Sequence, residues 1–291
     1  MDHSRIAALL AEFVGRLEES NPPAGVLLAN ISTYIDILLR WNARVNLTAI
    51  REPEEIVTRH FGESLFAARY LFPRASLLKE PAMLAPGPES ASARASSGHG
   101  DSETAVLREA LADETAPLSQ ESASGRAALQ GRVIAGKENG ALAPVAAVDV
   151  GSGAGFPGIP LKLWAPEISL TLVESNHKKA VFLREVARAL TLTDINIQTA
   201  RAETIPAGTF DLVTLRAVER FDRVLPAAAA LLKPQGRLAL LIGATQLSKA
   251  RSILPNHEFL PLIPIPLSTA RVLSVSYPSV MREYLSDKQV E

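Results

Sequence analysis

Three alternate glycines, Gly151, Gly153 and Gly155, follow a short apolar run and are the clearest sign of chemistry in the sequence. Glycine allows φ > 0 and lets the backbone approach a ligand without a Cβ in the way. The residues that follow predict a helix, whose first N–H groups would face a bound group. A plain tight turn also explains such a motif, so residues further along the chain must decide between the two interpretations.

Polar residues end or follow the next three predicted strands. Glu174 ends the second strand, Ala202 and Glu203 follow the third, and Arg216 follows the fourth. The carboxyl ends of parallel strands meet at one edge of a sheet, where ligands bind. A carboxylate such as Glu174 can accept hydrogen bonds from both hydroxyls of a ribose. Together with the glycines, these residues predict a site for a nucleoside cofactor.

Strands and helices alternate after residue 144, which predicts an α/β fold around a mostly parallel sheet with right-handed crossovers. The last two strands predict an antiparallel pair at one edge of that sheet. The predicted strands are 145–150, 170–174, 195–199, 210–215, 236–242, 259–266 and 272–277, and helices are expected at 178–190 and 224–232.

The first 73 residues are helical by periodicity, with helices expected at 2–19, at 24–41 and from Pro53 to Tyr70. In the third helix, Arg59 pairs with Glu63 and His60 pairs with Ser64 at i, i+4 spacing. Taken alone, such pairs indicate a solvated helix face or a helix salt bridge rather than a functional site.

Composition divides the chain into three parts. Residues 1–73 form the helical region, 74–144 are rich in small, polar and charged residues, and 145–291 carry the α/β pattern. The middle segment has too little apolar surface to offset its ordering entropy, which predicts a largely disordered insertion. We expect residues 1–73 to pack on the α/β domain.

The composition narrows the possible functions. The chain has no cysteine, which excludes disulfides, thiolate metal sites and cysteine nucleophiles, and no metal is expected. No apolar run is long enough to span a bilayer, so we expect a cytoplasmic protein without a membrane partner. A net charge of −1 gives no overall attraction to nucleic acid, so any RNA contact needs a local basic patch.

The glycine spacing distinguishes between two kinds of nucleoside cofactor. A dinucleotide loop reads G-x-G-x-x-G, whereas here the sequence is G-S-G-A-G-F and no basic residue follows before Pro160. Alternate glycines after Asp149 and Val150, an acidic end to the second strand and a later FDLV strand resemble the S-adenosylmethionine-dependent methyltransferases. The resemblance implies the Rossmann-like class I fold with S-adenosyl-L-methionine as cofactor. A nicotinamide-dependent oxidoreductase remains the alternative.

Several separated motifs narrow the resemblance. In chain order they are WNARVNLTAI, RHFGES, VDVGSGAGFPGIPL, RAET and LRAVE. They resemble the ribosomal RNA small subunit methyltransferase G family, also called glucose-inhibited division protein B, over residues 24–79 and 145–277. The resemblance implies methylation of N7 of one guanine in bacterial 16S ribosomal RNA, near the decoding site of the small ribosomal subunit.

The resemblance also implies roles for individual residues. Gly151, Phe156, Ala202, Glu203 and Arg216 match the family's cofactor contacts, and Arg59, His60 and Ser64 match its N-terminal motif. We expect Arg216, His60 and Ser64 to orient the guanine, and Glu174 and Glu203 to hold the ribose and adenine. The chain departs from the family at Glu63, where aspartate is usual, and at Ile242, where lysine is common.

RNA binding would rest on scattered side chains, with Trp41 as a possible stacking surface. The available cations are Arg40, Arg44, Arg51, Arg59, Lys178, Lys179, Arg184 and Arg188. We expect weak binding to naked RNA and a preference for the small ribosomal subunit or an assembly intermediate. The alternative is a ribosome-assembly binding protein that keeps the fold without turnover.

Overall fold

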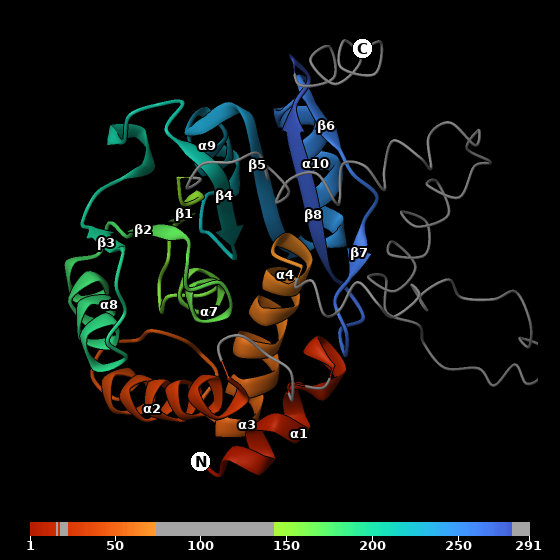
Figure 1. Ribbon diagram of the computed structural model, residues 1–291. Coiled ribbons are helices and arrows are strands. Elements are labelled where there is room, and N and C mark those ends of the chain that lie inside the picture. The colour runs from red at the N-terminus through yellow and green to blue at the C-terminus, as the bar shows by residue number, and fades with distance from the viewer. Residues whose placement is uncertain (16, 18–22, 74–142, 281–291) are drawn as a thin grey trace, which may run out of the picture.

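A twisted, mostly parallel sheet forms the centre of the computed structural model, which describes residues 1–15, 17, 23–73 and 143–280 (Figure 1). The strand order is β3-β2-β1-β4-β5-β8-β6, and β7 also pairs with β8. The strands are β1 (Ala146–Val150), β2 (Ser169–Val173), β3 (Ile195–Gln198), β4 (Phe210–Arg216), β5 (Leu232–Gly243), β6 (His257–Phe259), β7 (Ile263–Pro264) and β8 (Arg271–Pro278).

The predicted parallel sheet with an antiparallel edge is confirmed. Strands β1 to β5 pair in parallel, β8 runs antiparallel to β5, and β6 and β7 run antiparallel to β8. The continuous strand expected at 259–266 is wrong, because the chain there makes two short strands with a break between them. The prediction also missed the short helix α10 (Leu247–Ile253).

The N-terminal helices are α1 (His3–Val14), α2 (Ala24–Asn42) and a continuous run of α3 (Pro53–Glu55), η1 (Ile56–Gly62) and α4 (Glu63–Leu71). The Asp2 side chain caps α1, and Gly15 ends it with φ of 69°. The predicted helix at 2–19 is therefore too long. Segment η1 is a π-helical turn, a feature that is common at functional sites.

Helices cover both faces of the sheet. Helices α7 (Gly158–Trp164) and α8 (His177–Ala189) lie with the N-terminal helices on one face, and α9 (Phe221–Ala230) and α10 lie on the other (Figure 1). Alternate residues of each strand face opposite cores; in β4, for example, Leu212 joins the first core and Val213 the second.

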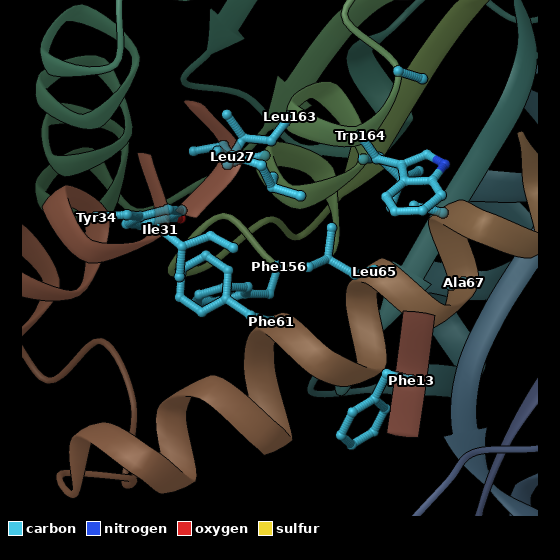
Figure 2. Close-up of a cluster of buried hydrophobic side chains, with 14 of the residues drawn as sticks. Phe13, Leu27, Ile31, Tyr34, Phe61, Leu65, Ala67, Phe156, Leu163 and Trp164 are labelled. Carbon is cyan, nitrogen blue, oxygen red and sulfur yellow. The ribbon is translucent and has the colours of Figure 1, made fainter. Parts of the chain in front are cut away.

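The N-terminal helices and the α/β part share one hydrophobic core. Figure 2 shows Tyr34 of α2, Phe61 of η1 and Phe156 of the glycine segment side by side. Polar contacts tie the same parts together, because Tyr34 donates a hydrogen bond to the carbonyl of Ala154 and Trp164 donates one to the carbonyl of Phe72. This packing brings η1 to the carboxyl edge of the sheet.

Candidate active site

A pocket of about 650 Å³ lies at the carboxyl edge of the parallel strands. Its volume falls within the range of roughly 300–1,000 Å³ typical of cofactor sites. The wall comes from the segments after β1, β2, β3 and β4, from Thr48, Arg59 and His60 of the N-terminal region, and from Arg271 at the start of β8. All four predicted strand ends therefore meet in one pocket.

The three glycines do not share one role. Gly151 and Gly153 have φ of 69° and 55° and line the pocket. Gly155, with φ of 85°, is not part of the wall, because it turns toward Tyr34, Ile159 and Leu183. Gly155 permits close packing of α2 and α8 behind the loop, and its role as a cofactor contact stays a prediction.

Glu174 fixes the shape of the glycine segment. Its Oε2 accepts a hydrogen bond of 2.8 Å from the N–H of Gly153, and its Oε1 accepts one of 2.7 Å from the N–H of Asn176. A carboxylate has about four acceptor positions, so two remain for ligand hydroxyls. Asn176 in turn caps α8 through the N–H groups of Lys178 and Lys179.

Phe156 lines the pocket from within a stack of aromatic rings. Its ring lies parallel to that of Tyr34 at 5.3 Å between centroids and stacks on His60 at 4.7 Å. Phe61 meets it edge-on at 5.1 Å. The stack joins the glycine segment to the N-terminal helices, so Phe156 has a packing role in addition to its place in the wall.

His60 enters the pocket as a neutral side chain. Burial lowers the pKa of His60 to about 3, and the positive charges of Arg216, Arg271 and Arg59 act in the same direction. Its Nε2 lies 2.8 Å from Oγ1 of Thr48, and its Nδ1 has no hydrogen-bond partner in the described residues. The ring is thus poorly suited to hold a proton at neutral pH.

Ser64, predicted as a catalytic residue, does not line the pocket. The side chain is fully buried, and its hydroxyl donates a hydrogen bond of 2.6 Å to the carbonyl of His60, one turn earlier in the helix. The i, i+4 spacing that suggested a pair with the His60 side chain instead links Ser64 to the backbone of His60.

Glu63 is buried among three arginines: the expected helix salt bridge between Arg59 and Glu63 is confirmed, but the helix face is not solvated at Glu63. Its side chain is 2% exposed, and its oxygens lie 3.2 Å from Nε of Arg59, 2.9 Å from Nη2 of Arg216 and 3.1 Å from Nε of Arg271. We call these four residues the arginine cluster. It joins η1 and α4 to the ends of β4 and β8 and carries two more positive than negative charges.

Within the cluster, Arg216 is turned inward. Its side chain is 7% exposed and donates hydrogen bonds to Glu63 and to the carbonyl of Arg59. Burial lowers the pKa of Arg216 to about 10, against the raising effect of Glu63, so the guanidinium stays charged at neutral pH. Arg216 lines the pocket as predicted, and its Nη2 holds Glu63 and the backbone of Arg59, whereas its buried Nε has no hydrogen-bond partner among the described residues.

Arg271 is a site residue that the sequence interpretation missed. It pairs with Gly243 across the β5–β8 ladder, directly beside Ile242, whose side chain is buried in the second core. The cation that position 242 lacks is therefore present on the neighbouring strand. The sequence predicts that the last strand is antiparallel. Such a strand begins at the edge where the parallel strands end, so Arg271 could have been placed near the site from that prediction.

Asp149 is a buried acid just before the glycine segment, outside the pocket wall. It lies in the middle of the sheet, where it accepts hydrogen bonds of 2.8 Å from Oγ1 of Thr214 and 3.3 Å from the N–H of Gly158, the first residue of α7. Burial raises the pKa of Asp149 to about 6, against the lowering effect of these hydrogen bonds. In the sequence, Asp149 is marked only as the one acid within an apolar strand.

Asp149 and His60 predict opposite effects of pH on stability. For His60, the unfolded chain binds more protons below pH 6.5, so stability is lost as pH falls from about 6.5 toward 3. For Asp149, the folded chain binds more protons between about pH 4 and 6, so stability is lost as pH rises. Each contributes a slope of about 1.4 kcal/mol per pH unit between pH 4 and 6, with opposite sign.

The two slopes cancel in the wild type, and urea unfolding of single variants at pH 4, 5 and 6 separates them. Relative to the wild type, the free energy of unfolding of His60→Gln is expected to fall more with rising pH, by about 1.4 kcal/mol per unit. Asp149→Asn should deviate by the same slope in the other direction. Altered packing in either variant adds a constant offset that leaves these slopes unchanged, and profiles parallel to the wild type would refute both assignments.

The remaining predicted residues lie where expected, with one exception. Ala202 and Glu203 line the pocket, and Glu203 forms an exposed ion pair of 3.4 Å with Arg223. The exception is Trp41, which is half-buried on the α8 side of the molecule, outside the pocket wall: its Nε1 donates to Glu185 and its ring makes a T-shaped contact with Phe182.

Two further features concern the described residues only. No His, Asp and Glu side chains there gather in a group of three or more that could hold a metal ion. No described helix is both long enough and apolar enough to cross a membrane.

The strand order, the glycine loop after β1 and the acid after β2 define a Rossmann-like S-adenosylmethionine-dependent methyltransferase. The chain matches the family described as rRNA small subunit methyltransferase G over residues 27–77 and 134–256, more than half of its length. The protein belongs to that family and is an S-adenosylmethionine-dependent enzyme. This supports methyl transfer over the nicotinamide-dependent or purely binding alternatives.

Two individual relatives carry the name of this family. The chain is 30% identical to ribosomal RNA small subunit methyltransferase G of Xylella fastidiosa over 233 residues, which are 80% of this chain and 76% of that protein. It is 32% identical to the protein of the same name from Halorhodospira halophila, over 74% of this chain and 69% of that one. Among solved structures, ribosomal protein L11 methylase from Lactobacillus delbrueckii subsp. bulgaricus is 21% identical with a TM-score of 0.41, over 53% of this chain and 78% of that one.

Proposed function

We propose that the protein transfers the methyl group of S-adenosylmethionine to N7 of a guanine in 16S ribosomal RNA. The single observation that supports this most directly is the pocket, which combines nucleoside-binding residues after β1 to β3 with a cationic wall from the arginine cluster. The former suit the cofactor and the latter suits a polyanionic substrate.

The reaction needs no proton transfer at the attacking atom. The N7 lone pair forms a bond to the methyl carbon while the carbon–sulfur bond breaks, its electrons stay on sulfur, and the positive charge passes from the sulfonium to the base. A neutral His60 with a pKa of about 3 fits this chemistry, because no strong base is required. The protein then contributes mainly alignment, which can supply on the order of 7–11 kcal/mol of barrier reduction.

The cofactor half of the pocket has defined roles in this proposal. Gly151 and Gly153 give backbone access to the ligand, Phe156 closes the wall beside them, and Glu174 accepts the ribose hydroxyls while holding Gly153. Ala202 and Glu203 contact the adenine side. His60 and Arg216 lie on the opposite wall. His60 faces the base, and Arg216 positions Arg59 by donating a hydrogen bond to the backbone carbonyl of Arg59.

The experiment is methyl transfer from tritiated S-adenosylmethionine to small ribosomal subunits from a strain that lacks this protein. The expected result is label on one guanine of 16S ribosomal RNA, with N7 as the modified atom after base mapping. Glu174→Gln keeps the side-chain shape but removes the charge, and should require more cofactor for the same rate. Label on protein, on another base or on another atom of guanine would contradict the proposal.

The same proposal extends to the setting of the reaction. A substrate within the small ribosomal subunit places the protein in the cytoplasm, and the chemistry requires no metal. The family match omits residues 78–133, which supports the proposal that the segment 74–144 is an insertion between the helical region and the α/β domain. That segment lies almost wholly outside the described residues.

A further inference from the structure

Cations line the pocket on both sides, with Lys179, Arg201 and Arg223 in the same wall as Glu174 and Glu203, but only at the other side do three arginines surround one buried acid. Glu174 and Glu203 follow β2 and β3 on one side, and the arginine cluster lies on the other side, where β4 and β8 meet η1. Strand β1 lies between β2, which precedes Glu174, and β4, which ends at Arg216. A nucleoside cofactor beside Glu174 and Glu203 therefore leaves the side of the arginine cluster for another ligand.

The arginine cluster is organised to present two guanidinium groups. Glu63 and Arg216 form the buried part, and the more exposed members are Arg59 and Arg271, whose side chains are 47% and 22% exposed. Arg59 donates one hydrogen bond to Glu63, whereas Nε of Arg271 is close to Glu63 without the geometry of a hydrogen bond. Among the described residues, neither terminal group makes a further hydrogen bond.

We propose that Arg59 and Arg271 bind a phosphate of the RNA strand next to the methylated nucleotide, and that Glu63 and Arg216 are positioning residues for them. This rests on the proposed function. A guanidinium matches a phosphate with a two-pronged hydrogen-bonding pattern, and the two surplus positive charges favour an anion over a neutral base. Arg271, the first residue of β8, supplies one of the two guanidinium groups of this phosphate site.

The test compares Arg271→Gln, Arg271→Lys and Arg59→Gln with a matched control, Arg5→Gln, which breaks an exposed ion pair with Glu54 in α1 and α3. Binding of each protein to unmethylated small subunits is measured across a salt series in the presence of S-adenosylhomocysteine. Affinity for S-adenosylhomocysteine alone is measured by calorimetry. Arg59 is half exposed, so its variant is informative even if the Arg271 variants fold poorly.

We expect Arg271→Gln and Arg59→Gln each to weaken subunit binding roughly 10-fold at about 0.1 M salt, the size of one charge-assisted hydrogen bond. The slope of log affinity against log salt should become shallower by roughly 0.7–0.9 for each phosphate that is no longer neutralised. Arg271→Lys should keep that slope, and all variants should keep the wild-type affinity for S-adenosylhomocysteine. In turnover, KM for subunits rises while kcat is retained.

Three outcomes would overturn the inference or its basis. An unchanged salt slope in both glutamine variants would show that no phosphate is bound there. Loss of S-adenosylhomocysteine affinity with intact subunit binding would assign the arginines to the carboxylate of the cofactor. Failure of the wild type and of Arg5→Gln to methylate subunits would instead refute the proposed function, and the phosphate site with it.

Discussion

Replacing Glu63 by glutamine is expected to lower the free energy of unfolding by about 3–5 kcal/mol, the usual cost of removing one partner from a buried ion pair. Glu63 is the carboxylate that all three cationic side chains of the cluster approach within 3.2 Å. Without its charge, the buried Arg216 repels Arg59 and Arg271 with no carboxylate between them. The neutral amide can keep part of the hydrogen bonding but cannot offset three positive charges.

Urea unfolding at neutral pH measures this loss, with Glu63→Asp as the matched control. Aspartate keeps the charge on a shorter side chain, so its loss of stability should be clearly smaller than that of Glu63→Gln. A Glu63→Gln protein as stable as the wild type would show that the three arginines do not depend on this carboxylate. In the folded fraction of Glu63→Gln, cofactor affinity should persist because Glu174 and the glycine segment are untouched.

The sequence predicts the sheet and the cofactor half of the pocket well, because both depend on local patterns. Buried strands read as apolar runs, and the topology of parallel strands brings their ends together whatever the details of packing. Gly151, Glu174 and Glu203 could thus be placed at the pocket from their positions after strands alone. The prediction of the sheet was wrong only at its antiparallel edge, where β6 and β7 take the place of the one strand expected at 259–266.

The cationic half of the pocket could not be predicted in the same way, because it depends on contacts between distant segments. Spacing alone made Glu63 a surface partner of Arg59, whereas tertiary packing buries it against Arg216 and Arg271. The same packing turns Ser64 away from the pocket. Helical periodicity says which residues share a face but not what covers that face.

The third N-terminal helical segment and the last strand of the sheet meet in this half of the site. Helix segment η1 supplies Arg59 and His60, and β8 supplies Arg271, so the pocket is complete only when the N-terminal helices dock on the finished sheet. The aromatic stack of His60, Phe156 and Tyr34 provides the apolar part of that docking. The glycine segment is thus held from behind by residues far from it in the sequence.

This arrangement makes Gly155→Ala a test of the docking rather than of cofactor contact. An alanine there would have φ of 85°, which costs about 1–2 kcal/mol, and its Cβ would meet the hydroxyl of Tyr34, Cδ1 of Ile159 at 2.8 Å and Cδ2 of Leu183 at 3.0 Å. Overpacking of this kind typically adds about 1–3 kcal/mol. We therefore expect the free energy of unfolding to fall by about 2–5 kcal/mol in total.

Gly153→Ala is the matched control, because it shares the positive φ but not the crowding. The nearest atom to a Cβ at Gly153 is the carbonyl oxygen of Gly151 at 3.8 Å, so only the backbone cost of about 1–2 kcal/mol applies. The added methyl group lies in the pocket wall and should weaken binding of S-adenosylhomocysteine more than it weakens folding. Urea unfolding and calorimetry on both variants separate the roles. Equal losses of stability would mean that the N-terminal helices do not press on the loop at Gly155, and the glycines would then act as a single ligand-binding turn.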